Sequence, residues 1–161
     1  MKTRLLFAAA AILALASCDR AITAEERVLQ GTWRADKHFV DLSGSDSNPK
    51  DTDNQLTFGP GGAFASEYFA YGSYGRPVTE LTTYFRSDGE YRLKGNSLKV
   101  RVVRITSQDV QFAEHNVVQW VDREWLLLGT VEVNGDRLTI HLPRGEMDVQ
   151  EMVVTYTRVQ D

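Results

Sequence analysis

The feature that most constrains this chain is an alternation of apolar and polar residues with a period of two, which begins at Thr32 and continues almost to the end. Short segments rich in Val, Thr, Tyr, Phe and Trp carry the alternation, and glycine, asparagine and aspartate separate them. A period of two is typical of β-strands, whose successive side chains point to opposite faces. Short turns between such segments favour antiparallel pairing of neighbouring strands. The chain is therefore predicted to be all-β.

Four turn signals divide this part of the chain. They are Gly59-Pro60-Gly61-Gly62, Ser87-Asp88-Gly89, Gly95-Asn96 and Asn134-Gly135-Asp136. The last two each lie between two alternating segments, and such glycine-asparagine and glycine-aspartate pairs predict tight hairpins.

The alternation also assigns faces to the strands. Tyr91 and Leu93 point to one face and Arg92 to the other, and residues 97–102 and 137–142 divide in the same way. One dry face and one wet face are expected when a sheet closes around a core. No long helical pattern interrupts the strands, which argues against a βαβ fold. We predict an antiparallel up-and-down β-barrel of about eight to ten strands, because closure removes unpaired strand edges.

A short helix is predicted before the first strand. Thr23 and Glu26 have the spacing of a capping box, in which the threonine accepts from a helix amide and the glutamate reaches back. The helix is expected over residues 24–30, and Gly31 is expected to end it.

The start of the chain has the layout of a secretory signal peptide, with Lys2 and Arg4 ahead of the apolar run Leu5–Ala16. This run is too short to span a bilayer comfortably. It ends in Leu15-Ala16-Ser17-Cys18, which resembles the bacterial lipobox, whose cysteine is lipidated and becomes the first residue of the mature protein. Cys18 is the only cysteine in the chain, so an intramolecular disulfide is excluded. The alternative is an ordinary cleaved signal peptide with an incidental cysteine.

The lipobox resemblance implies a protein exported from the cytoplasm and attached to a membrane of the bacterial cell envelope through acyl chains on Cys18, palmitate among them, with its domain on the periplasmic side. Two or more long acyl chains anchor a protein firmly. The chain then divides into a signal peptide over 1–17, a tether over 18–23 and a barrel domain over 24–161. Asp19 favours the inner membrane in the enterobacterial pathway, but the choice between inner and outer membrane stays open.

The composition excludes several other classes of protein. A chain of 161 residues is long enough for one domain with a core. Its net charge of −4 and the absence of a basic run argue against nucleic acid as a partner. With one cysteine and three scattered histidines, His38, His115 and His141, the chain offers no recognisable metal site, and no cofactor is predicted.

The first predicted strand opens with Gly31-Thr32-Trp33, which is similar to the Gly-x-Trp motif of lipocalins and of small bacterial lipocalin-like domains. Residues 89–98, 118–128 and 155–158 also resemble strands of those bacterial domains. The resemblance implies that Arg158, from the last strand, packs across Trp33 in a cation–π contact. The chain departs from secreted lipocalins because it has no disulfide pair and no obvious long C-terminal helix.

The same resemblance implies that the barrel binds a small apolar or amphipathic molecule. The candidate lining comes from the dry faces: Phe64, Tyr68, Leu81, Phe85, Tyr91, Leu93, Leu98, Val100 and Leu127. Small barrels hold one small ligand or are filled by their own side chains. If the interior is filled, the alternative is an interaction, assembly or protease-inhibitor protein that works through its outer surface. Within the aromatic stretch Glu67–Gly75, the segment from Tyr68 to Tyr74 is then the contact patch for an envelope protein, and otherwise the stretch is a structural rim.

The polar run Asp41–Asn54 is predicted to be a solvated loop or a lid beside the barrel mouth. A calcium site at Asp46, Asp51 and Asp53 is disfavoured because the EF-hand spacing and its terminal glutamate are missing. The chain also lacks a nucleophile elbow and a phosphate-binding glycine loop. It is therefore predicted not to be an enzyme.

Overall fold

The structure is a computed structural model that describes residues 20–36, 51–143 and 152–160. Its elements are α1 (Ala24–Arg27), β1 (Gly31–Ala35), β2 (Asp51–Phe58), the 3₁₀ turn η1 (Pro60–Gly62), β3 (Ala63–Tyr71), β4 (Leu81–Lys94), β5 (Ser97–Asp109), the 3₁₀ turn η2 (Ala113–His115), β6 (Val117–Trp120), β7 (Leu126–Asn134), β8 (Arg137–His141) and β9 (Val153–Arg158). None of the helices in these residues is long and apolar enough to cross a membrane.

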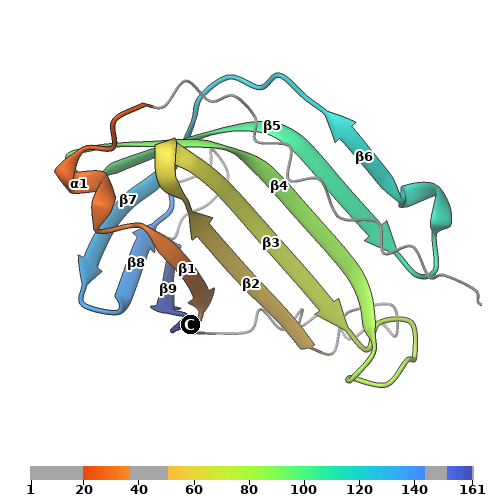
Figure 1. The fold of residues 1–161 in the computed structure, drawn as a ribbon. Coiled ribbons are helices and arrows are strands. Elements are labelled where there is room, and N and C mark those ends of the chain that lie inside the picture. Colours follow the sequence, from red (N-terminus) through yellow and green to blue (C-terminus); the bar gives the residue numbers. More distant parts are fainter. Residues whose placement is uncertain (1–19, 37–50, 144–151, 161) are drawn as a thin grey trace, which may run out of the picture.

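Eight strands close into a barrel. Each pairs antiparallel with its neighbours in the order β1-β2-β3-β4-β5-β7-β8-β9, and β9 pairs with β1 to complete the ring. The ninth strand, β6, pairs with the second half of β5, outside the ring (Figure 1). This arrangement confirms the predicted antiparallel up-and-down barrel.

Three of the four predicted turns are confirmed, and one is wrong. The chain turns at η1, at Gly95-Asn96 and at Gly135-Asp136, as expected. Ser87-Asp88-Gly89, in contrast, lies inside β4, where the pairing with β5 shifts register. Gly89 pairs with Val102 and Asp88 with Arg104, so Val103 is an extra residue on β5, as in a β-bulge.

Gly89 does not form a turn. It allows the backbones of β4 and β5 to approach each other closely. A Cβ atom added to Gly89 would lie 1.9 Å from the carbonyl oxygen of Arg101 on β5. No side chain fits at that distance, so only glycine lets the two backbones approach at the bulge.

The N-terminal helix forms with the predicted capping box but is shorter than expected. Thr23 Oγ1 accepts from the Glu26 amide at 3.2 Å, and Glu26 Oε2 accepts from the Thr23 amide at 3.0 Å. The helix ends at Arg27 and not at residue 30. Carbonyl groups after it bind side chains of the barrel instead, since Leu29 accepts from Trp33 and Val28 from Arg158.

The hydrophobic core gathers at the end of the barrel that α1 covers. Its buried members come from the segment after α1 and from the strands β1, β2, β3, β4, β5, β7 and β8. They are Leu29, Trp33, Leu56, Phe58, Phe64, Tyr91, Leu93, Leu98, Val100, Val131, Leu138 and Ile140. Val154, Tyr156 and Arg158 of β9 share the inward row, because they pair with Ile140, Leu138 and Trp33. These pairings identify the inward-facing side chains of β9.

The predicted polar loop over Asp41–Asn54 is wrong for its last four residues. Asp51–Asn54 begin β2 and pair with Tyr71–Tyr68 of β3. Residues 37–50 lie outside the described residues.

Replacement of Gly89 by alanine should lower the free energy of unfolding by about 2 kcal/mol, because the added Cβ forces β4 and β5 apart at the bulge. Urea denaturation followed by tryptophan fluorescence measures the change. Gly135→Asn is the matched control, since Gly135 has a φ of 59° and open space around it, and asparagine tolerates this conformation. Equal stability of Gly89→Ala and wild type would contradict the close approach.

Candidate functional site

At one end of the barrel, the buried carboxylate of Glu26 joins α1 to strand β4. It accepts hydrogen bonds from the Arg20 guanidinium at 2.8 Å, from the Thr23 amide at 3.0 Å and from the Leu93 amide of β4 at 3.1 Å. Burial disfavours the charged form, but these donors outweigh it, and the pKa of Glu26 is lowered. An ionised, fully buried side chain therefore fixes the helix to the barrel.

A tryptophan and an arginine complete this closed end. The guanidinium of Arg158 lies 4.1 Å from the centre of the Trp33 ring, as expected, and its Nη2 donates to the Val28 carbonyl at 2.9 Å. It also donates to the Gln30 carbonyl and lies 3.4 Å from Asp136 Oδ1. Trp33 is fully buried and donates from Nε1 to the Leu29 carbonyl at 2.7 Å. Side chains thus fill the closed end of the barrel. The indole nitrogen of the buried Trp33 keeps a hydrogen-bond acceptor there.

Farther from α1, the same inward rows carry partly exposed side chains. Phe64 on β3 and Tyr91 on β4 are buried, whereas Tyr68 and Phe85, which continue these two rows and face each other, are only partly covered. Phe85 is 39% exposed. The inward surface of this half, which we call the open half, therefore presents aromatic rings to solvent.

Polar groups accompany these rings. Small hydroxyl and amide side chains occupy inward positions beside Tyr68 and Phe85, as the strand register shows: Asn54, Ser66, Ser87 and Ser107. All four are partly buried. An inward surface of aromatic rings and uncharged hydrogen-bonding groups suits an amphipathic molecule better than an ion.

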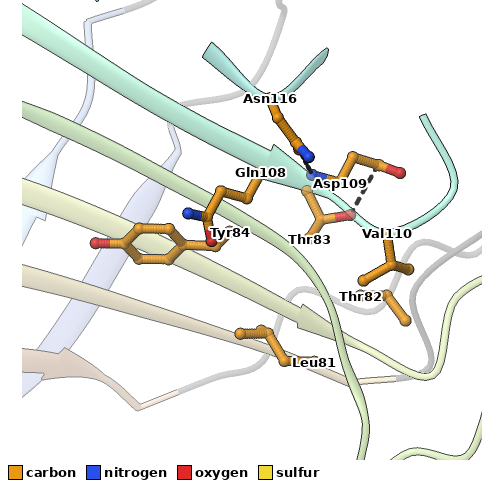
Figure 2. Close-up of a pocket in the computed structure, with 8 residues that line it drawn as sticks. All are labelled: Leu81, Thr82, Thr83, Tyr84, Gln108, Asp109, Val110 and Asn116. Atoms are coloured by element: carbon orange, nitrogen blue, oxygen red, sulfur yellow. Dashed lines mark hydrogen bonds between the residues drawn. The ribbon is translucent and has the colours of Figure 1, made fainter. Parts of the chain in front are cut away.

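A pocket of about 200 Å³ lies where β4 begins and β5 ends (Figure 2). Its lining residues are Leu81, Thr82, Thr83, Tyr84, Gln108, Asp109, Val110 and Asn116. The pocket is therefore at the far end of the β4–β5 hairpin, away from α1 (Figure 1).

The only carboxylate in this lining, Asp109, is engaged by its neighbours. It accepts hydrogen bonds from the hydroxyls of Tyr74 and Thr83, both at 3.2 Å, and from the amides of Gln111 at 2.8 Å and Phe112 at 3.0 Å. Burial opposes its ionisation, but these donors prevail and lower its pKa. Asp109 thus organises the connection from β5 to β6 and is not a free acceptor for a ligand.

A ladder of charged side chains crosses the outward face of the sheet. Arg34 on β1 pairs with Asp53 on β2 at 2.8 Å. Arg86 on β4 pairs with Glu67 on β3 at 3.1 Å, and Asp88 joins it to Arg104 on β5 with both distances at 2.7 Å. Tyr84 also donates to Glu67 at 2.8 Å, and burial together with this contact raises the Tyr84 pKa. The ladder binds neighbouring strands together, and its positive and negative charges are matched.

The structure separates the nine predicted lining residues into distinct groups. Phe64, Tyr91, Leu93, Leu98 and Val100 are buried in the core of the closed end. Tyr68 and Phe85 lie in the open half, and Leu81 lines the pocket at its rim. Leu127 pairs with Lys99, so it shares the outward row and not the row of Leu98 and Val100.

Sequence reasoning missed the polar inward groups of the open half. Ser87 was hidden because glycine and aspartate beside it predict a turn, and Asn54 because it ends a polar run. The alternation that marks Tyr91 and Leu93 as inward would have placed Ser87 on the same row, had it been carried past Gly89.

The remaining candidates do not gather into a site. Cys18, His38 and Asp46 lie outside the described residues. His141 faces outward opposite Thr130, and His115 lies beside Phe112 with the two rings tilted and their centres 5.2 Å apart. Among the described residues, His, Cys, Asp and Glu side chains form no group able to hold a metal ion.

Comparison with protein-family models finds no match to this chain, and comparison with curated protein sequences finds none either.

Replacement of Glu26 by glutamine should cost about 2 kcal/mol of stability near neutral pH, because the buried donors lose their charged acceptor. The pKa of Glu26 lies below its ordinary value of 4.5 in the folded chain, so its ionised form stabilises the fold above that pH. This contribution is lost as the pH falls through the lowered value. Urea denaturation of both proteins at about pH 7 and about pH 3 should show the gap narrowing in acid.

The neighbouring substitution Glu25→Gln is the control for this experiment. Glu25 is exposed, and it accepts a hydrogen bond from the Gly95 amide that is 3.2 Å long and also exposed. It should change stability by less than about 0.5 kcal/mol. A gap for Glu26→Gln that is the same at both pH values would refute the role of the ionised carboxylate.

Proposed function

We propose that this chain is a lipid-anchored lipoprotein of the bacterial cell envelope whose lipocalin-like barrel binds one small hydrophobic or amphipathic molecule. The observation that carries the ligand proposal is the exposure of Phe85, an aromatic side chain on an inward row that is buried elsewhere along the barrel. Exposed apolar surface inside a fold is stabilised when a ligand removes it from water.

The residues of the open half define the ligand's chemical class. Tyr68 and Phe85 offer apolar area, and Ser66, Ser87 and Ser107 offer hydroxyl groups within the same surface. The core fills the closed end, so the ligand occupies only part of the interior. A single molecule with an apolar body and an uncharged polar group fits this arrangement.

The anchoring proposal rests on the sequence Leu15-Ala16-Ser17-Cys18 after a basic start and an apolar run. Arg20, two residues after Cys18, supports it from the structural side. Its guanidinium binds Glu26 at 2.8 Å and the Tyr91 carbonyl at 3.1 Å, so the chain already contacts the barrel two residues after Cys18. Lipid on Cys18 would hold the domain close to the membrane surface.

A second candidate function is an interaction or assembly protein that acts through its outer surface. The observation that favours it is the filled closed end together with apolar side chains on the outside, such as Val118 and Trp120 on β6. Such a protein would bind no apolar probe in its barrel, and this separates the two functions.

Replacement of Phe85 by serine should weaken binding of the uncharged fluorescent probe N-phenyl-1-naphthylamine about tenfold, because the variant removes apolar area from the open half. Fluorescence titration of the full chain measures the affinity. Leu127→Ser is the matched control, since Leu127 has nearly the same exposed fraction, 37%, but lies on the outward row. The ligand proposal fails if the wild type does not bind the probe or if both variants weaken it equally.

Replacement of Cys18 by serine should abolish incorporation of radiolabelled palmitate in bacterial cells and move the protein out of the membrane fraction, because the acylated thiol is removed. Ser17→Ala is the control and should retain the label, because it keeps a small residue before the cysteine. Labelling that persists in Cys18→Ser would overturn the anchoring proposal without touching the ligand proposal.

A further inference from the structure

Strand β6 stands apart from the closed barrel. It pairs with β5 through Arg104–Ser107 on one side, and no described strand pairs with its other side. In Figure 1 it is the outermost strand, beyond β5 and at the opposite end of the molecule from α1. Within the ring each of the eight strands has two ring neighbours, whereas β6 pairs with β5 alone and therefore leaves an open edge along its whole length.

The hydrogen-bonding groups on this edge can be assigned from the pairing with β5. The Val121 amide donates to the Val103 carbonyl at 2.8 Å, so the backbone groups of residue 121 point toward β5. Successive residues of an antiparallel strand point to alternate sides. The N–H and C=O groups of Val118 and Trp120 therefore point to the open edge.

The side chains of β6 do nothing to protect this edge. All four residues, Val117–Trp120, are exposed, with Val118 at 68% and Trp120 at 58%. None is charged and none is proline, although edge strands usually carry lysine, proline or other charges that block further pairing. An exposed, uncharged edge strand that contains valine and tryptophan favours pairing with another β-strand.

We propose that β6 pairs antiparallel with β6 of a second copy of this chain, with Gln119 of the two copies opposite each other on the two-fold axis. In this register Val118 lies opposite Trp120 of the partner subunit, and both residues have their backbone groups on the open edge. Each such pair exchanges two hydrogen bonds. It also joins a β-branched to an aromatic side chain on the same face, which stabilises cross-strand pairing.

In this register β6 is complementary to itself. For this reason we assign a second copy of the chain as the partner that pairs with the open edge. Two-fold symmetry places each Val118 against a Trp120 twice over, and no like charges meet because β6 has none. The contact is small beside the 1,200–2,000 Å² or so that stable interfaces bury. The dimer should therefore depend on concentration, with a dissociation constant of about tens of micromolar.

Disulfide trapping tests the register. Gln119→Cys is made in the full chain together with Cys18→Ser, so that the introduced cysteine is the only thiol. A non-hydrogen-bonded antiparallel pair has its Cα atoms about 4.5 Å apart, within the range of a disulfide. Mild oxidation should give a covalent dimer in high yield. Thr130→Cys, exposed on β7, is the control and should remain monomeric.

Sedimentation equilibrium over about 1 to 200 µM tests the edge itself. Val118→Pro removes an amide that points to the open edge and leaves the bonds to β5 intact, so it should be monomeric with an unchanged barrel by circular dichroism. Val118→Thr keeps the amide and the branched shape and should dimerise like the wild type. A wild type that is monomeric throughout, or a Val118→Pro variant that dimerises, overturns the proposal, as does a Gln119→Cys chain that gives no disulfide dimer.

Discussion

The structure depends on the contact between Trp33 and Arg158, which joins the first strand of the barrel to the last. Trp33 is fully buried, Arg158 lies 4.1 Å from its ring centre, and the two residues are also direct partners in the β1–β9 register. This one pair therefore supplies an aromatic core residue and a cation–π contact. It is also one of the residue pairs that join β1 to β9 and so close the barrel. Arg158 also binds carbonyl groups after α1, so the helix, the core and the closure of the ring are stabilised together.

The two ends of the barrel differ in how tightly their interiors are packed. At the closed end, Glu26 is ionised and satisfied by three donors, and large side chains fill the interior. The open half keeps Phe85 partly in water on an inward row. Such exposure costs stability, and the dense packing around Trp33 offsets that cost. The fold therefore tolerates a partly exposed aromatic side chain in the open half because the closed end is densely packed.

The alternation of residues predicted most of the fold but only part of the site. Tyr91 and Leu93 are inward, and the hairpins at Gly95 and Gly135 form, because both signals depend on neighbours in sequence. Ser87-Asp88-Gly89 was mistaken for a turn because glycine is needed both at turns and where two backbones approach closely. Leu127 was assigned to the wrong row because the β5–β7 register shifts beside it, between Leu98 and Lys99. Such shifts arise from contacts between distant strands, which a local pattern does not contain.

The short seam between β1 and β9 determines how the barrel responds to a pulling force. The chain enters β1 and leaves β9 at the same end, so tension on the two chain ends would load the seam as a zipper and not in shear. Within the seam, the hydrogen bond from the Val159 amide to the Thr32 carbonyl would break first, and the Trp33–Arg158 pair would follow. Beyond this pair the seam continues through Arg34–Thr157 and Ala35–Tyr156 and ends with the hydrogen bond from the Asp36 amide to the Thr155 carbonyl. The contact that closes the barrel is therefore also the place where mechanical opening would begin.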